Sequence, residues 1–252
     1  MSLFRSLVFT SVLVGLIVGT VVTLAQFLGT TPLILAAEVY ETGETAESHD
    51  TGTVAGTTHE HDAGVAHDHD AATATEAHDH HSADAWAPAD GIERTAYTLA
   101  ANILTAIGFA LVLNGLMQIS GRHSDWRSGL IWGLCGFVVV MLAPGFGLHP
   151  ELPGTPAAPL FERQVWWVGT ALSTAAGLAL LFFQRKPWAA AVAIVLIALP
   201  HVIGAPVPPE GEQALAPEAM SHRFVVIATL TSLLFWALLG SLSGHLRRRF
   251  EA

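Results

Sequence analysis

The chain contains six runs of apolar residues, each about as long as a helix that crosses a lipid bilayer. Such a helix needs roughly 20 apolar residues. The runs cover Phe4–Leu28, Thr95–Ile119, Leu130–Leu148, Val165–Phe183, Trp188–Gly204 and Phe224–Gly244. Only 13% of the residues are charged, against about 25% in an ordinary soluble domain. We therefore expect an all-α integral membrane protein with about six transmembrane helices. The fifth run, which ends at Pro200 and His201, is the shortest.

The distribution of lysine and arginine supports six crossings and indicates their direction. Cytoplasmic loops of membrane proteins carry an excess of these residues. With both termini in the cytoplasm, the basic residues inside are Arg5, Arg122, Arg127, Arg185, Lys186, Arg247, Arg248 and Arg249. The basic residues outside are Arg94, Arg163 and Arg223, each at the mouth of a helix where its stem can snorkel. Without the fifth crossing, the basic cluster at the C-terminus would lie outside.

The N-terminus leaves one alternative open. Arg5, an apolar run and Leu35-Ala36-Ala37 resemble a signal peptide with a cleavage site. The run is longer than the usual apolar segment of a signal peptide, about 7–15 residues, so we expect the first helix to be retained. Cleavage would leave five helices with unchanged orientations.

A polar insert, residues 38–93, separates the first helix and its exit, residues 1–37, from a five-helix membrane core, residues 94–252. The insert carries 14 of the 21 acidic residues, no lysine or arginine, and eight of the 13 histidines. Most of its other residues are alanine, threonine and glycine, which cannot build a hydrophobic core. We therefore expect a largely disordered loop on the outer side of the membrane.

Histidine and acidic residues alternate in this insert, a composition typical of metal binding. Imidazole is a good donor to first-row divalent metals, and a carboxylate adds charge attraction. The candidate ligands in the loop are His59, His61, His67, His69, His78, His80 and His81. Such ligands bind Cu²⁺, Ni²⁺ and Zn²⁺ more tightly than Co²⁺, so the loop does not select the metal. Two alternatives stay open: a merely solvated acidic loop, and a pH sensor whose histidines titrate near neutral pH.

Further polar residues lie where the helices reach the outer face. Glu38 follows the first helix, Glu93 precedes the second, and His201 lies inside the fifth apolar run. Ionisable groups inside a membrane are costly and commonly functional, so His201 is the strongest of the three candidates for a metal path. Pro144 and Pro200 lie near the ends of the third and fifth runs, and each frees a backbone carbonyl in the preceding turn.

Two kinds of residue predict how the helices pack. For Asn102 and Asn114 we expect hydrogen bonds between helices. Pairs of glycines four residues apart allow two helices to approach closely. These pairs are Gly15 and Gly19, Gly129 and Gly133, and Gly240 and Gly244.

Charge and cysteine content exclude several classes of function. The formal net charge of −10 argues against a nucleic-acid partner. The single cysteine, Cys135, excludes a disulfide framework and a thiolate metal cluster. We find no candidate catalytic carboxylate or histidine at mid-depth in the apolar runs, so we expect neither an enzyme nor a tightly bound cofactor.

A series of short motifs resembles one known family. The motifs are Pro32-Leu-Ile-Leu-Ala-Ala-Glu38-Val-Tyr-Glu41, Trp86-Ala-Pro-Ala-Asp-Gly-Ile-Glu-Arg94, Ala101-Asn102, Gly108-Phe-Ala-Leu111, Leu142-Ala-Pro144, Pro150-Glu-Leu-Pro-Gly154, Arg163-Gln-Val-Trp-Trp167, Leu199-Pro-His-Val-Ile-Gly-Ala-Pro206 and Phe235-Trp236. In order and spacing they resemble the CbtA family, described as the predicted membrane subunit of a cobalt transporter. His149 stands where we expect a proline in the family pattern, which weakens any family role for this residue.

The resemblance implies uptake of cobalt for cobalamin synthesis, and a companion, CbtB, a small single-span subunit with its own histidines. We therefore expect a multi-pass protein of the bacterial cytoplasmic membrane that takes up Co²⁺, with Ni²⁺ and Zn²⁺ as open alternatives. The loop would capture the ion and pass it towards His201, Glu38 and Glu93. The alternative is a membrane protein that senses or buffers metal without transport. A membrane enzyme or metal-cofactor assembly factor ranks last. Energy coupling and the oligomeric state, homo-oligomers included, stay open.

Overall fold

A computed structural model describes residues 3–50, 88–89, 91–121, 125–184 and 186–251. These residues form helices joined by turns and irregular segments, with no β-strand among them. The elements are α1 (Leu3–Leu28), α2 (Thr30–Asp50), α3 (Ile92–Ser120), α4 (Trp126–Phe137), the π-helix η1 (Val138–Leu142), α5 (Ala143–Gly145), α6 (Leu160–Phe183), α7 (Pro187–Ile203) and α8 (Glu218–Glu251). The predicted all-α membrane architecture is confirmed.

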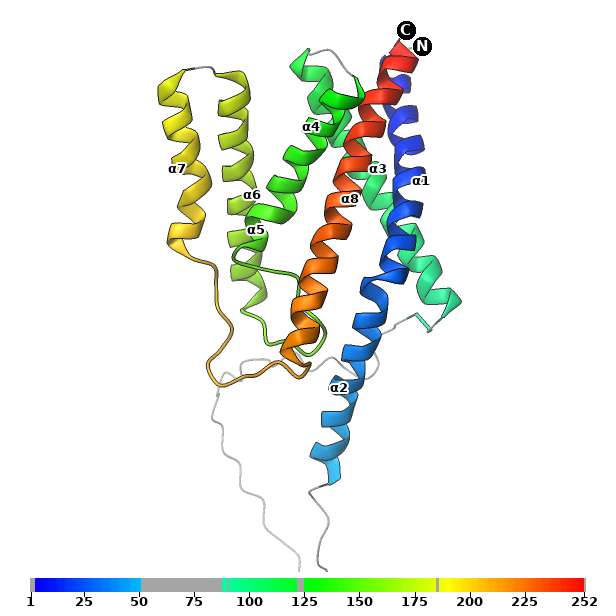
Figure 1. Ribbon diagram of the computed structural model, residues 1–252, viewed down its shortest axis with the longest axis vertical. Coiled ribbons are helices and arrows are strands. Elements are labelled where there is room, and N and C mark those ends of the chain that lie inside the picture. The colour runs from blue at the N-terminus through cyan, green and yellow to red at the C-terminus, as the bar shows by residue number, and fades with distance from the viewer. Residues whose placement is uncertain (1–2, 51–87, 90, 122–124, 185, 252) are drawn as a thin grey trace, which may run out of the picture.

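The number of long spans differs slightly from the prediction. In the described part of the chain, the helical stretches long and apolar enough to cross a membrane are Phe4–Leu28, Ile92–Ser120, Trp126–Gly145, Leu160–Phe183 and Glu218–Arg249. The predicted fifth helix is α7, which is apolar but has only 17 residues. Pro187 begins α7, and Gly204, with φ 91°, ends it. The two chain termini lie at the same end of the bundle (Figure 1).

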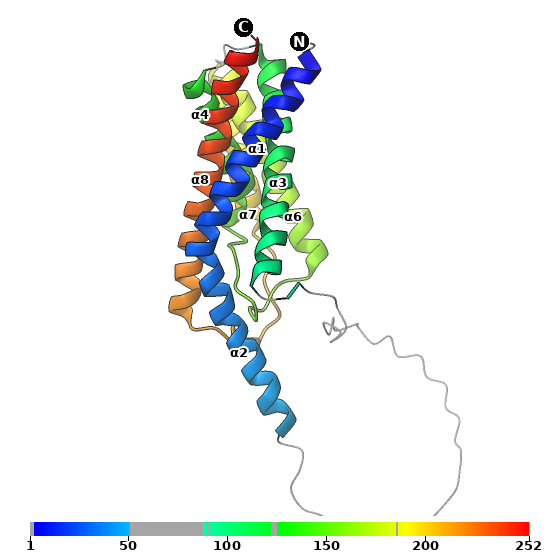
Figure 2. The same cartoon turned by 90° about the vertical axis from the view of Figure 1, so that its right-hand side faces the viewer.

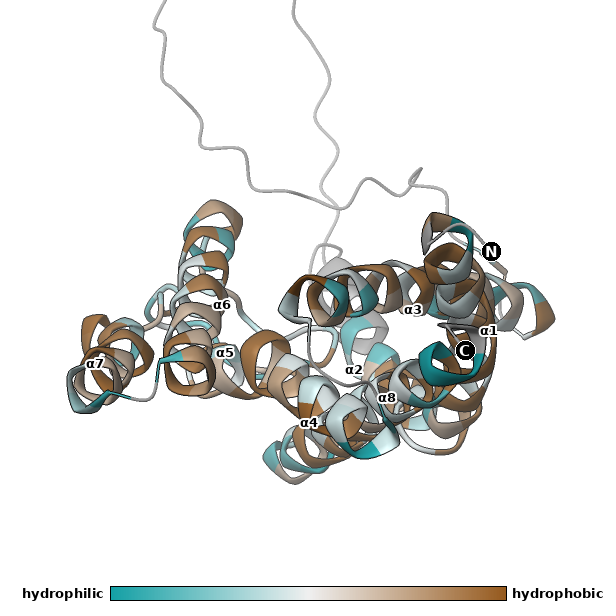
Figure 3. Cartoon of the chain, turned by 90° about the horizontal axis from the view of Figure 1, so that it is seen from above, coloured by the Kyte–Doolittle hydropathy of each residue, from teal (hydrophilic) through white to brown (hydrophobic). Residues whose placement is uncertain are grey.

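The helices form two groups. α1, α3, α4 and α8 pack together, and α6 and α7 form a hairpin beside them (Figure 1). Figure 2 shows α1 crossing in front of α3 and α8, the two helices that it packs against. The hairpin joins the larger group chiefly through η1 and α5, and from above it extends to one side (Figure 3).

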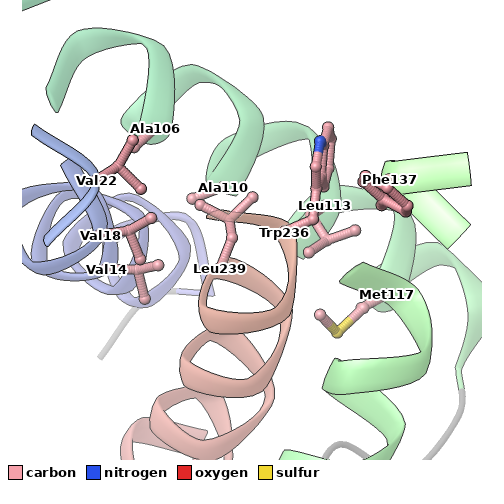
Figure 4. Packing of buried hydrophobic residues seen from close by; sticks show 10 residues of the cluster. All are labelled: Val14, Val18, Val22, Ala106, Ala110, Leu113, Met117, Phe137, Trp236 and Leu239. Carbon is pink, nitrogen blue, oxygen red and sulfur yellow. The ribbon is translucent and has the colours of Figure 1, made fainter. Parts of the chain in front are cut away.

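The hydrophobic core lies within the larger group of helices. Val14 and Val18 of α1 are fully buried and pack with Ala106 and Ala110 of α3 and Leu239 of α8 (Figure 4). Small and medium side chains fill the contact of α1 with α3, so these two backbones lie close together, and Met117, Phe137 and Trp236 fill the rest of the core. Van der Waals packing of this kind is one of the forces that hold helices together in lipid.

Glycines form the closest contacts between helices. A Cβ atom added to Gly19 would lie 2.6 Å from the Cα of Ile103, and one added to Gly240 would lie 2.7 Å from the Cα of Gly133. Such separations leave no room for a side chain, since real Cβ atoms essentially never approach so closely. The structure therefore confirms that the glycine pairs lie at helix contacts.

Both asparagines in the second apolar run bond to another helix, as predicted. Asn102 Nδ2 donates to Thr23 Oγ1 at 2.9 Å and to Gln26 Oε1 at 2.6 Å. Asn114, fully buried, donates through Nδ2 to Ser11 Oγ at 3.0 Å. These bonds fix the register of α3 against α1.

A buried arginine adds a third helix to this polar contact. Arg247 of α8 is 6% exposed and donates through Nη1 to the Asn114 carbonyl oxygen at 3.1 Å. Its Nη2 donates to Gln118 Oε1. Neutral acceptors on α3 therefore stabilise a buried cation on α8, where the sequence indicated only a basic cytoplasmic tail.

The polar insert begins in a helix. α2 runs through residues 38–50, where the sequence led us to expect the start of a disordered loop. This stretch contains alanine and glutamate, which favour helices, and it follows α1 after a break at Gly29. Ala37 of α2 is fully buried against Leu152, Ala216 and Phe224. Residues 51–87 lie outside the described residues.

Candidate metal path

The seven candidate histidines of the loop, residues 59–81, lie outside the described residues. Their role as metal ligands therefore stays a prediction. The other three candidates, Glu38, Glu93 and His201, are described, and each has its own surroundings.

Glu38 is paired with an arginine. Arg94 Nη2 lies 2.5 Å from Glu38 Oε1, and Arg94 Nη1 donates to Oε2 at 3.2 Å. This two-pronged geometry is the strong form of an arginine–carboxylate bond. Both side chains are about one-third exposed, 32% for Arg94 and 35% for Glu38. The pair joins α2 to α3 at the end of the bundle away from the chain termini and neutralises the charge of the carboxylate.

Glu93 lies beside this pair in sequence but makes a different contact. Its Oε2 accepts a hydrogen bond from the Ala89 N–H at 3.3 Å. Glu93 stands in the first turn of α3. A carboxylate in this position is stabilised by the positive end of the helix dipole. The structure therefore bonds Glu93 to the segment that directly precedes α3.

His201 lies in the last turn of α7, directly after Pro200. The imidazole meets two aromatic rings edge-on: Trp166, with ring centroids 5.9 Å apart, and Phe146, with centroids 6.2 Å apart. Trp166 Nε1 donates to the Pro200 carbonyl oxygen at 3.2 Å, which holds the indole against this turn. His201 itself is exposed on the surface of the chain.

A cavity of about 360 Å³ opens beside His201, between α7 and the η1–α5 segment. The residues that line it are Val138, Leu142, Ala143, Phe146, Ile194, Ile197, Ala198 and His201. His201 is the one ionisable residue of this lining. The imidazole therefore marks the edge of an otherwise apolar cavity.

The two helical stretches that border this cavity, Trp126–Gly145 and α7, each contain a proline near their C-terminal end. α4 passes into the π-helix η1 just before Pro144, and π-helical turns are frequent at functional sites. In α7, Pro200 has no N–H to donate to the Leu196 carbonyl oxygen, which accepts from the Ser173 hydroxyl of α6 instead. A polar side chain of α6 therefore supplies the hydrogen bond that Pro200 cannot, and α7 continues as a helix to Ile203.

Irregular segments follow α5 and α7 at the end of the bundle away from the chain termini (Figure 1). Residues 146–159 lead to α6, and residues 204–217 lead to α8. They meet where the Leu215 N–H donates to the Gly154 carbonyl oxygen at 3.2 Å. Arg163 of α6 lies 3.4 Å from Glu151 in the first segment. The two segments therefore contact each other, although most residues of 204–217 are exposed.

The candidates do not converge on one closed site. Within the described residues, no group of three or more His, Cys, Asp or Glu side chains is placed to hold a metal ion. Glu38 and Glu93 already have partners, and His201 lies among aromatic rings. Among the described residues, these candidates are therefore separate side chains and not one set of metal ligands.

Sequence reasoning missed three features of this region. The first is the pairing of Arg94 with Glu38 and of Arg163 with Glu151, since we expected these arginines only to snorkel. The second is the bond of Ser173 to Leu196, and the third is the π-helix. The acidic residues Glu38 and Glu151, each in one of the quoted sequence motifs, were the signal in the sequence that could have predicted these ion pairs.

Comparison with known proteins adds a family. A sequence model described as "Probable cobalt transporter subunit (CbtA)" matches residues 4–248. The match covers every described helix. No curated protein and no solved structure matches the chain.

Proposed function

Because the chain belongs to the CbtA family of probable cobalt transporter subunits, we propose that it carries divalent metal, above all Co²⁺, into the cell across the bacterial cytoplasmic membrane. The observation that carries this proposal is the family match over nearly the whole chain. The helices long enough to cross a membrane support it. The imported cobalt would serve cobalamin synthesis. Membership of a transporter-subunit family also agrees with a non-enzymatic role.

The histidine-rich loop is proposed as the collector of metal. Its seven histidines, His59 to His81, would bind Co²⁺ weakly and pass it from one histidine to the next. This binding would raise the local concentration of Co²⁺ at the outer face. Capture does not need ligands fixed in place, as catalysis does. Ni²⁺ and Zn²⁺ would compete for the same imidazoles.

The ion is then proposed to pass the outer end of the bundle near Glu38, Glu93 and His201. The Glu38–Arg94 pair implies a condition on this step: a metal can use the Glu38 carboxylate only after Arg94 has moved away. The membrane potential favours inward movement of a cation by about 2.3 kcal/mol per charge for each 100 mV. A divalent ion gains about twice that amount.

Orientation and partner belong to the same proposal. The termini share one end of the bundle, and the basic cluster of α8 lies at that end, so we place both termini in the cytoplasm (Figure 1). The family description makes the chain one subunit of a complex. The companion is proposed to be a CbtB-like small single-span protein with histidines. Association of several copies of this chain stays open.

The experiment that tests transport measures radiolabelled cobalt accumulation in cells that lack their own cobalt importer. The cells express this chain, the companion, both or neither, and nickel or zinc is added as competitor. We expect uptake only when this chain is present. Absence of uptake with both proteins present in the membrane would contradict transport.

Deletion of residues 49–81 tests the collector. We expect uptake to fall at low cobalt and to persist at high cobalt, because a concentrating loop matters only when the ion is scarce. A second variant keeps the length and acidic residues of the loop and replaces only its histidines by asparagine, so that it tests the histidines alone. It should behave as the deletion does. Equal loss of uptake at low and high cobalt would contradict a collecting role.

A second function, metal sensing or buffering without transport, is favoured by one observation. A second cavity, of about 560 Å³ and between α3, α4 and α6, is lined almost entirely by apolar side chains and offers no polar route for an ion. Sensing or buffering would give cobalt binding by the loop with no accumulation inside cells. The uptake experiment therefore separates the two functions.

A further inference from the structure

An apolar groove runs between α3, α4 and α6. Its volume is about 560 Å³. Phe109 and Val112 of α3 form one wall, Trp132 and the adjacent η1 form the floor, and Ala179 and Phe182 of α6 form the opposite wall. The groove lies at the depth of membrane-spanning helices, so its occupant must be apolar.

The two walls of the groove are not packed against each other. The helix pairs with extensive contact are α1–α3, α4–α8, α6–α7 and α1–α8, and α3 with α6 is not one of them. Seen from above, α3 and α6 stand on the same side of α4 (Figure 3). The three helices therefore form a cradle with one side open.

The wall formed by α6 has the chemistry of a helix contact. Elsewhere in this chain, close helix contacts rest on small residues four apart, such as Gly15 and Gly19. α6 presents the same spacing in the groove with Ala175 and Ala179, and Ala176 adds a third small side chain. Small residues at this spacing let the backbone of another helix approach, the main source of helix affinity in lipid.

We propose that this groove seats one transmembrane helix of the partner subunit. The proposal rests on the proposed function in one respect, that the chain is a subunit of a complex. The partner helix is apolar over the depth of the groove. It carries aliphatic side chains opposite Ala176 and Ala179 and runs along α3 and α6.

Two other occupants fit these observations less well. A second copy related by two-fold symmetry would place the same face against itself. Two concave faces set against each other leave a void, so the groove is a poor two-fold interface. A lipid chain fills any apolar hollow, but its binding gives no reason for small residues at helix-contact spacing on α6.

The test is photo-crosslinking in the membrane of the cells that naturally make the protein. p-Benzoylphenylalanine replaces Val112 or Phe182, on opposite walls of the groove. In the matched control it replaces Leu181, which is exposed on α6 but does not line the groove. We expect both groove positions to give an adduct with a different polypeptide, linked within an apolar stretch of about 20 residues. Leu181 should give lipid adducts only.

A second variant tests whether the groove itself selects the partner. Ala179→Phe fills the groove at its narrow wall, and Leu181→Phe adds the same bulk on another face of α6. Overpacking of one contact commonly costs 1–3 kcal/mol, so the adduct at Val112 should fall about tenfold in Ala179→Phe. It should be unchanged in Leu181→Phe. Elution as a single species in detergent with unchanged helix content shows that each variant folds.

Three outcomes would overturn the proposal. They are an adduct of twice the chain's own mass, lipid adducts alone at the groove positions, and the same polypeptide captured at Leu181. None of these readouts depends on metal. A chain that imports no cobalt but gives the specific adduct contradicts the proposed function alone, and the reverse result contradicts this inference alone.

Discussion

At the scale of single residues, His201 is the candidate for which the structure provides most context. It is exposed at the edge of a cavity, it follows Pro200 in the last turn of α7, and two aromatic rings restrict its position. Ligands held by neighbouring groups bind metals better than free ones. The imidazole therefore combines access with a restricted geometry, which the loop histidines are not expected to have.

We expect His201→Ala to lower cobalt uptake about tenfold or more, since loss of even an outer partner of a metal ligand costs that much. The measurement is the initial rate of radiolabelled cobalt accumulation at equal protein level in the membrane. His245→Ala is the matched control, because His245 is also exposed but lies near the C-terminal end of α8. Equal uptake by the two variants would remove His201 from the path.

Asp125 supplies a prediction about pH. It caps α4: Ser128 N–H donates to Asp125 Oδ1 at 2.7 Å, and this bond holds the pKa of the Asp125 carboxyl below its ordinary value of 3.8. The lowered pKa means that its contribution to stability is complete above the unfolded pKa and is lost as pH falls through the folded pKa. Asp125→Asn keeps a capping oxygen without the charge.

The melting temperatures of the wild-type protein and Asp125→Asn, measured in detergent, should therefore differ most at neutral pH. The difference should shrink as the pH falls below the pKa of a free aspartate. A difference that stays constant over the whole range would show that the charge of Asp125 does not stabilise the cap.

At the scale of elements, α7 shows how a side chain can replace a missing backbone hydrogen bond. Ser173→Ala leaves the Leu196 carbonyl oxygen without its donor, and an unsatisfied buried acceptor costs about 1–3 kcal/mol. In a Pro200→Ala background, residue 200 regains an N–H that bonds Leu196 itself. The same Ser173→Ala change should then cost close to nothing. Chemical unfolding of the four proteins in detergent measures this coupling.

Ser241→Ala is the control for that cycle, because the Ser241 hydroxyl bonds Ala237 within its own helix. It should have a small effect in either background. Equal costs of Ser173→Ala with and without Pro200 would mean that the proline is not what frees the Leu196 carbonyl.

The sequence predicted where the helices of this protein lie better than where their regular hydrogen bonding changes. Long apolar runs define where helices cross, and α1, α3, α6 and α8 are found where those runs lie. The π-helix was not predictable, because Pro144 can be accommodated by a kink, an end or a wider turn. The choice depends on the packing of α6 against η1. α7 was identified as the shortest run, and its 17 residues confirm that reading.

The contacts of individual side chains were predictable only where the chemistry left one solution. Asn102 and Asn114 lie in apolar helices, so bonds to another helix were the expected outcome and are confirmed. Glu38 and Arg94 lie 56 residues apart. Their pairing depends on α2 continuing as a helix past residue 38, which the acidic composition of the insert concealed.

At the scale of the whole molecule, the two groups of helices should differ in stability. α4 and α8 share a close glycine contact and a core, whereas α7 packs chiefly against α6. Local opening needs the least free energy where few buried contacts are lost. We therefore expect backbone amides of α7 to exchange hydrogen faster than those at the α4–α8 contact. Hydrogen exchange of the chain in lipid nanodiscs measures this, and equal protection would contradict it.

The shortness of α7 makes the bilayer itself part of this protein's chemistry. Its 17 residues span about 25 Å at 1.5 Å per residue, and a typical hydrocarbon core is about 30 Å thick. Either the bilayer beside α7 becomes thinner, or the C-terminal end of the helix lies below the headgroups, and both changes cost free energy. His201 stands at that end. Acyl-chain length therefore helps to determine how deeply water reaches towards the imidazole.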